Sequence, residues 1–161
     1  MSILFTGGDI IDLAVQTEIE GERFYRAAAE RADDPTVRDL FLFLAGEEVR
    51  HRETFEGLSD SIVVAEIDPT TWQEGVAYIR ATVDRAFFSG PGAPIRVISA
   101  SATVPEMVRG AIAFEQQTLL FFGALRDLVQ PPNRPMIDVI VAEERSHVRR
   151  LAELLPSDDD R

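Results

Sequence analysis

The sequence contains no cysteine among its 161 residues. This absence excludes disulfide bonds within the chain and any iron or zinc site held by thiolates. No apolar run approaches the roughly 18 residues that a membrane-spanning helix needs. Residues 1–6 lack the basic segment and the long apolar run of a secretory signal peptide. We therefore expect a cytoplasmic protein without a membrane partner.

Basic residues are few compared with acidic ones. The sequence has 16 Lys and Arg residues in total and 28 Asp and Glu residues, which gives a formal net charge of −12. A surface this acidic repels the phosphate backbone, so nucleic acid is not expected as a partner. Hydrophobic residues make up 45% of the chain. That share, over 161 residues, suffices to bury a core, and we expect a single domain spanning residues 1–161.

Only two histidines occur, and both end the same four-residue pattern. Glu48 precedes His51 by three residues, and Glu144 precedes His147 by three. Side chains three residues apart lie on one face of a helix, about one turn from each other. A single Glu-x-x-His is most often a solvated pair, but both copies here interrupt apolar helical stripes. The two pairs are therefore candidate metal ligands.

A lone glutamate precedes each pair at nearly the same distance. Glu18 lies 30 residues before Glu48, and Glu115 lies 29 residues before Glu144. Turn-forming residues, Asp-Asp-Pro at 33–35 and Gln-Pro-Pro-Asn at 130–133, fall about midway in each interval. Residues equally far from the turn of an antiparallel hairpin face each other. The spacing therefore predicts that four carboxylates and two imidazoles meet at one level of a four-helix bundle.

These patterns predict an all-α fold of two helical hairpins, residues 9–58 and 103–155, joined by a long crossover at 59–102 and followed by a tail at 156–161. The first helix is expected to start with a cap at Asp9 and to end near Ala32, and the second to start at Asp34-Pro35. The third is expected to start with a capping box at Thr103 and to end at Val129. The last is expected to follow Asn133 and to end before Pro156. Within the crossover we expect a helix from about Thr71 to Phe87 and a short helix at 95–102.

Four carboxylates and two imidazoles form a ligand set suited to iron, manganese or zinc. Ionised carboxylates crowded in a dry interior are costly, and two divalent cations would balance four of them. If two glutamates bridge the cations, the metals would lie about 3.5–4 Å apart, close enough to act on one bound oxygen species. The predicted site is therefore a buried dimetal centre.

Some positions stay open at this point. Glu20 and Glu22 lie near Glu18, and Glu22 shares nearly the same helix face, so either could replace it as a ligand. Tyr25, two turns after Glu18, could hydrogen-bond a ligand carboxylate or could simply pack in the core. Two further glutamates, Glu47 and Glu143, immediately precede the candidate ligands Glu48 and Glu144. They point about 100° away, which favours a place at the surface or beside the ligands.

Three segments resemble motifs of the rubrerythrin-like branch of the ferritin-like superfamily. Residues 18–25 are similar to the first-helix motif, in which the ligand glutamate precedes a tyrosine by seven, as Glu18 precedes Tyr25. Residues 45–51 and 142–147 are similar to the second- and fourth-helix motifs. The resemblance covers 9–58 and 103–155. It implies a non-haem centre of two iron ions that reacts with peroxide or dioxygen, in a homodimer or larger homo-oligomer.

Two departures from that family bear on the activity. Rubrerythrins that reduce peroxide carry an additional glutamate three residues after the third-helix ligand, where this chain has Thr118. They commonly carry a cysteine-ligated iron module as electron donor, which this sequence lacks, so an external donor would be needed. The expected function is a peroxidase or ferroxidase-like oxidoreductase. The alternative is non-catalytic iron binding, storage or delivery with the same ligands.

Overall fold

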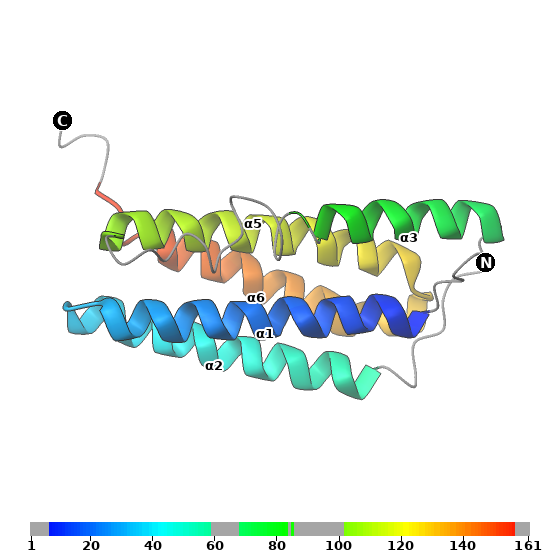
Figure 1. Ribbon diagram of the computed structural model, residues 1–161. Helices are drawn as coiled ribbons and strands as arrows, with labels where there is room; N and C mark the ends of the chain where they lie inside the picture. The colour runs from blue at the N-terminus through cyan, green and yellow to red at the C-terminus, as the bar shows by residue number, and fades with distance from the viewer. Residues whose placement is uncertain (1–6, 59–67, 84, 86–101, 157–161) are drawn as a thin grey trace.

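Four long helices form a bundle, and a shorter helix lies beside it (Figure 1). The computed structural model describes residues 7–58, 68–83, 85 and 102–156. Its elements are α1 (Gly7–Arg31), α2 (Pro35–Leu58), α3 (Pro69–Val83), α5 (Val104–Leu128), the 3-10 turn η2 (Pro131–Asn133) and α6 (Arg134–Ala152). The predicted all-α, ferritin-like bundle is confirmed.

The long helices form two antiparallel hairpins, α1 with α2 and α5 with α6 (Figure 1). Helices α2 and α5 run in the same direction, so α5 begins at the end of the bundle opposite to the one where α2 ends. The connection between the two hairpins therefore has to cross the length of the bundle. Helix α3 belongs to this connection and packs against both α1 and α5. None of the helices described is long and apolar enough to cross a membrane.

Two helix starts follow the capping chemistry predicted from the sequence. The Asp34 carboxylate accepts hydrogen bonds from the backbone N–H groups of Thr36 (2.7 Å) and Val37 (3.2 Å). At α5 the Thr103 hydroxyl accepts from the backbone N–H of Glu106, whose carboxylate accepts from the backbone N–H of Thr103 at 2.7 Å. Both caps satisfy N–H groups that a helix cannot pair internally.

Two predicted boundaries need correction. Helix α1 begins at Gly7, so Asp9 lies inside its first turn rather than at the cap. Helix α3 begins at Pro69 rather than near Thr71, because the Asp68 carboxylate accepts the backbone N–H of Thr71 at 2.9 Å and Pro69 suits the first helical position. The predicted end of this helix at 87 and the predicted short helix at 95–102 lie almost wholly outside the described residues.

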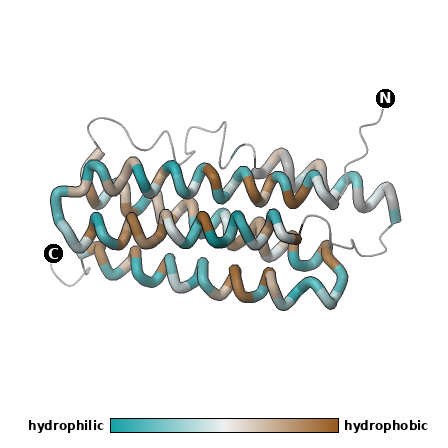
Figure 2. The backbone as a smooth tube through the Cα atoms, turned by 90° about the horizontal axis from the view of Figure 1, so that it is seen from below, coloured by the Kyte–Doolittle hydropathy of each residue, from teal (hydrophilic) through white to brown (hydrophobic). Residues whose placement is uncertain are grey.

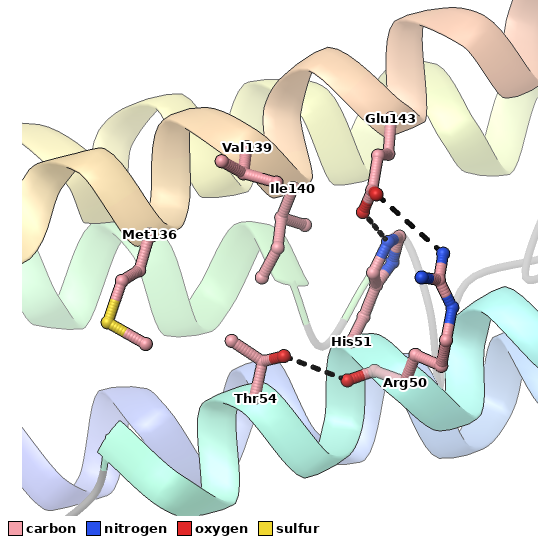
Figure 3. A pocket seen from close by; sticks show the side chains of 7 residues that line it. All are labelled: Arg50, His51, Thr54, Met136, Val139, Ile140 and Glu143. Atoms are coloured by element: carbon pink, nitrogen blue, oxygen red, sulfur yellow. Dashed lines mark hydrogen bonds and ion pairs between the residues drawn. The ribbon is translucent and has the colours of Figure 1, made fainter.

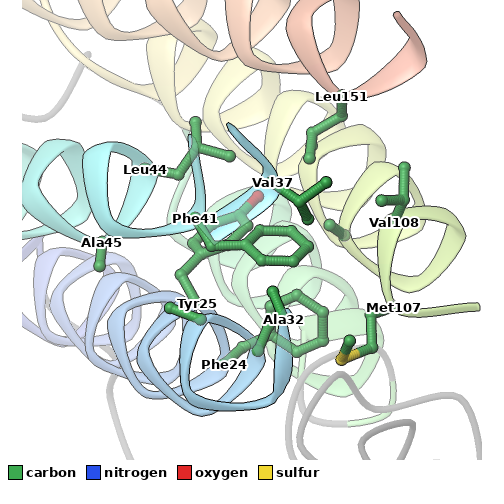
Figure 4. Packing of buried hydrophobic residues seen from close by; sticks show 13 residues of the cluster. Phe24, Tyr25, Ala32, Val37, Phe41, Leu44, Ala45, Met107, Val108 and Leu151 are labelled. Carbon is green, nitrogen blue, oxygen red and sulfur yellow. The ribbon is translucent and has the colours of Figure 1, made fainter. Parts of the chain in front are cut away.

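The core consists of two apolar clusters separated along the bundle by a polar layer. Hydrophobic and hydrophilic residues alternate in short bands along each helix (Figure 2), as amphipathic packing requires. One cluster includes Ile11, Phe55 and Ile140. The other includes Phe41 and Leu151 (Figure 4). On α1, α2, α5 and α6 the candidate ligands stand between residues of the first cluster and residues of the second.

Candidate metal centre

The structure brings all six candidate ligands together in the polar layer. They form two overlapping groups of four, and within each group the ligand atoms lie within 4.8 Å of one another. One group is Glu18, Glu48, His51 and Glu144, and the other is Glu48, Glu115, Glu144 and His147. Glu48 from α2 and Glu144 from α6 therefore belong to both groups, which is the arrangement that two bridged cations need.

The cluster is almost completely buried and has few hydrogen bonds. The four glutamates are 0% exposed and both histidines 2%. Among the described residues, no hydrogen-bond partner meets either carboxylate oxygen of Glu18 or Glu48, one oxygen each of Glu115 and Glu144, or Nδ1 of His51. A buried polar atom left unpaired costs about 1–3 kcal/mol. So many orphaned donor atoms in one place fit a site completed by cations.

The spacing of the donor atoms supports the same conclusion. His51 Nδ1 lies 2.9 Å from Glu144 Oε1, although neither atom has a hydrogen-bond partner. Two ligand atoms bound at about 2.1 Å and at right angles around one metal lie about 3 Å apart. His147 Nδ1 lies 2.8 Å from Glu144 Oε2 and 3.6 Å from Glu115 Oε1. Both imidazoles thus present Nδ1 to the shared carboxylate Glu144.

Burial controls the protonation of the carboxylates. It raises the pKa of Glu18 to about 7, with a further contribution from the charge of Glu144. The pKa values of Glu48 and Glu115 lie well above their usual range, because both are buried beside other carboxylates. Burial acts on Glu144 in the same direction, but its close contacts with the imidazoles of His147 and His51 hold its pKa below the ordinary value.

The histidines show the opposite balance. Burial alone would lower the pKa of an imidazole, yet contacts with Glu144 and neighbouring carboxylates raise the pKa of His51 to about 9. Contacts with Glu115 and Glu144 raise the pKa of His147 to about 10. The cluster therefore takes up protons when no other cation balances its negative charge. Two divalent metals would supply the positive charge that the four carboxylates need, with the two imidazoles as neutral ligands.

Tyr25 contacts the centre directly. Its buried hydroxyl on α1 donates a hydrogen bond to Glu115 Oε1 on α5. Burial and the negative charge of Glu115 raise the pKa of Tyr25 well above its usual value, so the phenol keeps its proton. Of the two roles that the sequence left open for Tyr25, the structure supports the hydrogen bond to a candidate ligand.

The structure also separates Glu18 from its acidic neighbours. Glu20 pairs with Arg23 at 2.7 Å on the outside of α1. Glu22 pairs with Arg26 at 2.8 Å and with Arg52 of α2 at 2.9 Å. Since both side chains are engaged in outward-facing ion pairs, Glu18 is the residue of the three that enters the cluster.

Of the two places predicted for Glu47 and Glu143, at the surface or beside the ligands, the structure shows them facing the ligand histidines. Glu143 Oε2 on α6 lies 2.8 Å from His51 Nε2 on α2, and Glu47 Oε2 on α2 lies 3.9 Å from His147 Nε2 on α6. Each glutamate thus faces the outer nitrogen of the histidine on the opposite helix. The available signal was their shared position, directly before Glu48 and Glu144.

A hollow of about 260 Å³ between α2 and α6 leads to the His51 side of the centre (Figure 3). His51, Glu143 and Arg50 line one side of it, and the remaining lining residues are Thr54, Met136, Val139 and Ile140. Most of the surface that the lining residues expose to the hollow is apolar, although four of them carry polar or charged groups. Of the six candidate ligands, His51 is the one that lines this hollow.

Fold and site together define a ferritin-like bundle with a buried carboxylate–histidine cluster that could hold two metal ions. The rubrerythrin family model matches residues 9–155, and the chain belongs to the rubrerythrin family. Its structure is similar to the crystal structure of a Thermotoga maritima protein assigned to the ferritin-like diiron-carboxylate class, with a TM-score of 0.68 and 27% identity. That match covers 93% of this chain and 94% of the other. No curated protein matches the chain.

Proposed function

We propose that the protein is a non-haem di-iron oxidoreductase of rubrerythrin type that reacts with hydrogen peroxide or dioxygen. The observation that carries the proposal is the sharing of Glu48 and Glu144 between two buried ligand groups. Glu18 and His51 would complete one metal position, and the corresponding pair on α5 and α6 would complete the other. When bound, two ferrous ions supply two electrons, which with two protons suffice to reduce one hydrogen peroxide to two waters.

The protein residues around the centre suit this role. Tyr25 holds one carboxylate oxygen of Glu115 and so limits its movement. The apolar clusters on both sides keep bulk water away, which strengthens electrostatic interactions at the centre. The hollow beside His51 gives a small neutral oxidant a route of approach. None of these features requires a large organic substrate.

Completion of a catalytic cycle would depend on an outside electron donor. The sequence has no cysteine with which to bind a second, thiolate-held iron. Thr118 occupies the position of the additional glutamate of peroxide-reducing relatives; it is fully buried, and its hydroxyl has no hydrogen-bond partner among the described residues. A ferroxidase-like reaction, in which ferrous iron is the reductant, is therefore as well supported as peroxidase turnover.

The test is an anaerobic titration. Protein loaded with ferrous iron is mixed with less hydrogen peroxide than the bound iron can reduce. The peroxide and the ferrous iron that remain are then measured. We expect two bound ferrous ions per chain and two oxidised per peroxide consumed, much faster than free ferrous iron reacts under the same conditions. The Glu48→Ala variant should lose this reaction. A repeat with dioxygen would identify the preferred oxidant.

Two results would overturn the proposal. Two tightly held ferrous ions that neither peroxide nor dioxygen oxidises would indicate an iron-binding or delivery protein. Manganese or zinc in protein purified without added metal, with iron bound more weakly, would indicate a different centre. Elemental analysis of that protein decides this second point.

A further inference from the structure

The glutamates beside the centre form a crossed arrangement between α2 and α6. Glu143 precedes the shared ligand Glu144 on α6 and lies 2.8 Å from His51 Nε2 on α2 (Figure 3). Glu47 precedes the shared ligand Glu48 on α2 and faces Nε2 of the other histidine, on α6, at 3.9 Å. Each helix thus supplies both a histidine for the cluster and a carboxylate for the histidine of its partner.

This arrangement bears on which imidazole nitrogen can bind metal. A carboxylate accepts hydrogen bonds, so an imidazole nitrogen 2.8 Å from Glu143 carries its proton toward that residue. A neutral imidazole has one protonated nitrogen, and the other keeps its lone pair. In His51 that other nitrogen is Nδ1, which lies in the cluster 2.9 Å from Glu144 Oε1. The contact with Glu143 therefore fixes both the tautomer and the direction of the ring.

We propose that Glu143 is a positioning residue that holds His51 with Nδ1 toward its metal, and that Glu47 acts more weakly on His147 in the same way. The inference rests on the proposed dimetal function. Partners of this kind orient a ligand histidine and raise its basicity. Glu143 itself need not touch the metal or the substrate, since its side chain is 35% exposed on the rim of the hollow.

Arg50 contacts the two glutamates unequally. Its guanidinium donates a hydrogen bond to Glu47 and lies 3.6 Å from Glu143 Oε1. Glu47, which accepts the hydrogen bond from Arg50, lies 3.9 Å from His147, whereas Glu143 lies 2.8 Å from His51. The position of the second Glu-x-x-His that corresponds to Arg50 is Ser146, so no arginine occupies that position on α6. We therefore expect the loss of Glu143 to have the larger effect.

The experiment uses cobalt(II), whose visible absorption depends on its ligands and which is not oxidised during the measurement. Wild type, Glu143→Ala, Glu143→Gln and Glu47→Ala are loaded with two equivalents, and EDTA extraction is followed. We expect Glu143→Ala to release one of two cobalt ions about 10–100-fold faster than wild type, with an altered spectrum. Glu143→Gln should lie in between, because the amide oxygen still accepts from Nε2–H. Glu47→Ala should have a smaller effect.

Two controls separate this role from general charge effects. Glu53→Gln removes an exposed carboxylate from α2 and should leave both rates unchanged. Arg50→Gln removes the surface ion pairs but keeps the Glu143–His51 contact, so it should not reproduce the fast release. Thermal unfolding of the metal-free variants shows whether each of them folds. If Glu143→Ala does not fold, the release rate of Glu143→Gln alone is compared with that of the wild type.

The inference is overturned if Glu143→Ala and Glu143→Gln release cobalt at the wild-type rate. Fast release from Arg50→Gln equal to that of Glu143→Ala would also overturn it, as would failure of the wild type to hold two cobalt ions. By contrast, a wild type that holds two cobalt ions but never oxidises iron would refute the proposed oxidoreductase activity. That result would leave the role of Glu143 intact.

Discussion

The hydroxyl of Tyr25 on α1 donates a hydrogen bond to Glu115 on α5, across the interior of the bundle. In the second hairpin the residue seven positions after the lone glutamate is Phe122, which has no hydroxyl. Both carboxylate oxygens of Glu18 lack a hydrogen-bond partner in the described part of the chain. The two outer carboxylates of the centre are therefore held differently, although the sequences around them are similarly spaced.

Replacement of Tyr25 by phenylalanine should weaken the hold on Glu115. The change leaves a buried carboxylate oxygen without its donor, so we expect the metal-free protein to lose about 1–3 kcal/mol of unfolding free energy. The loaded protein should still bind two metals but release the Glu115-side metal faster. Urea unfolding and chelator extraction measure the two effects. Tyr78→Phe is the control, because Tyr78 is 73% exposed on α3; equal behaviour of the two variants would contradict the prediction.

Shared and outer ligands should differ in how many metals they control. Glu48→Ala and Glu144→Ala remove carboxylates common to both ligand groups, so we expect neither variant to retain metal after gel filtration. Glu18→Ala and Glu115→Ala each affect one group and should leave one metal bound. Elemental analysis per chain, with circular dichroism to confirm helicity, measures this. Retention of both metals by Glu48→Ala would refute its place as a bridge.

The main elements of the centre could be predicted because they depend on geometry within one helix or one hairpin. A Glu-x-x-His pair shares a helix face whatever surrounds it. The turn at 33–35 fixes the level at which Glu18 faces Glu48, and the bundle brings the second hairpin to the same level. These relations do not require knowledge of how the hairpins are rotated relative to each other.

The contacts of Glu47 and Glu143 could not be predicted in this way. On their own helices, both residues are turned about 100° away from the ligands and thus away from the cluster. The contact of Glu143 with His51 depends on the distance and rotation between α2 and α6, which sequence spacing does not specify. Sequence spacing also could not decide between Glu18 and Glu22 as the ligand. One ion-pair partner of Glu22 is Arg52, which lies on another helix.

Gly21 allows α1 to approach the centre, and alanine at this position should disturb it. An added Cβ would lie 2.8 Å from Phe114 Cζ and 3.0 Å from Glu48 Cδ. Alanine favours helix by about 1 kcal/mol over glycine, but overpacking a buried site costs about 1–3 kcal/mol. We therefore expect Gly21→Ala to lower the melting temperature and to weaken metal binding through displacement of Glu48.

Gly46 on α2 provides the matched control, because a Cβ there would meet no atom within 4 Å. Gly46→Ala should raise the melting temperature and leave metal binding unchanged, as helix propensity alone then decides the outcome. The two variants should thus shift stability in opposite directions. A stabilised Gly21→Ala variant with normal metal affinity would show that Phe114 and Glu48 move aside without cost.

The metal-free protein should become less stable as pH rises above the ordinary carboxyl range. Glu18 has an ordinary pKa of 4.5 and a pKa of about 7 in the folded chain, where Glu48, His51, Glu144 and His147 surround it. Between these values the folded state binds more protons than the unfolded state, so each rise in pH favours unfolding. His51, raised from 6.5 to about 9, extends the same trend to higher pH.

Thermal unfolding of metal-free protein from pH 5 to 9 measures this decline. Glu18→Gln removes one of the titrating groups, so its melting temperature should fall less between about pH 5 and 7 than that of wild type. Glu30→Gln, which changes an exposed glutamate on the same helix, should follow the wild-type curve. Bound divalent metal should reverse the trend, because metal binding requires deprotonated ligands and strengthens as protons are lost. A metal-free protein whose stability increases up to pH 9 would contradict the idea that the cluster holds protons in place of cations.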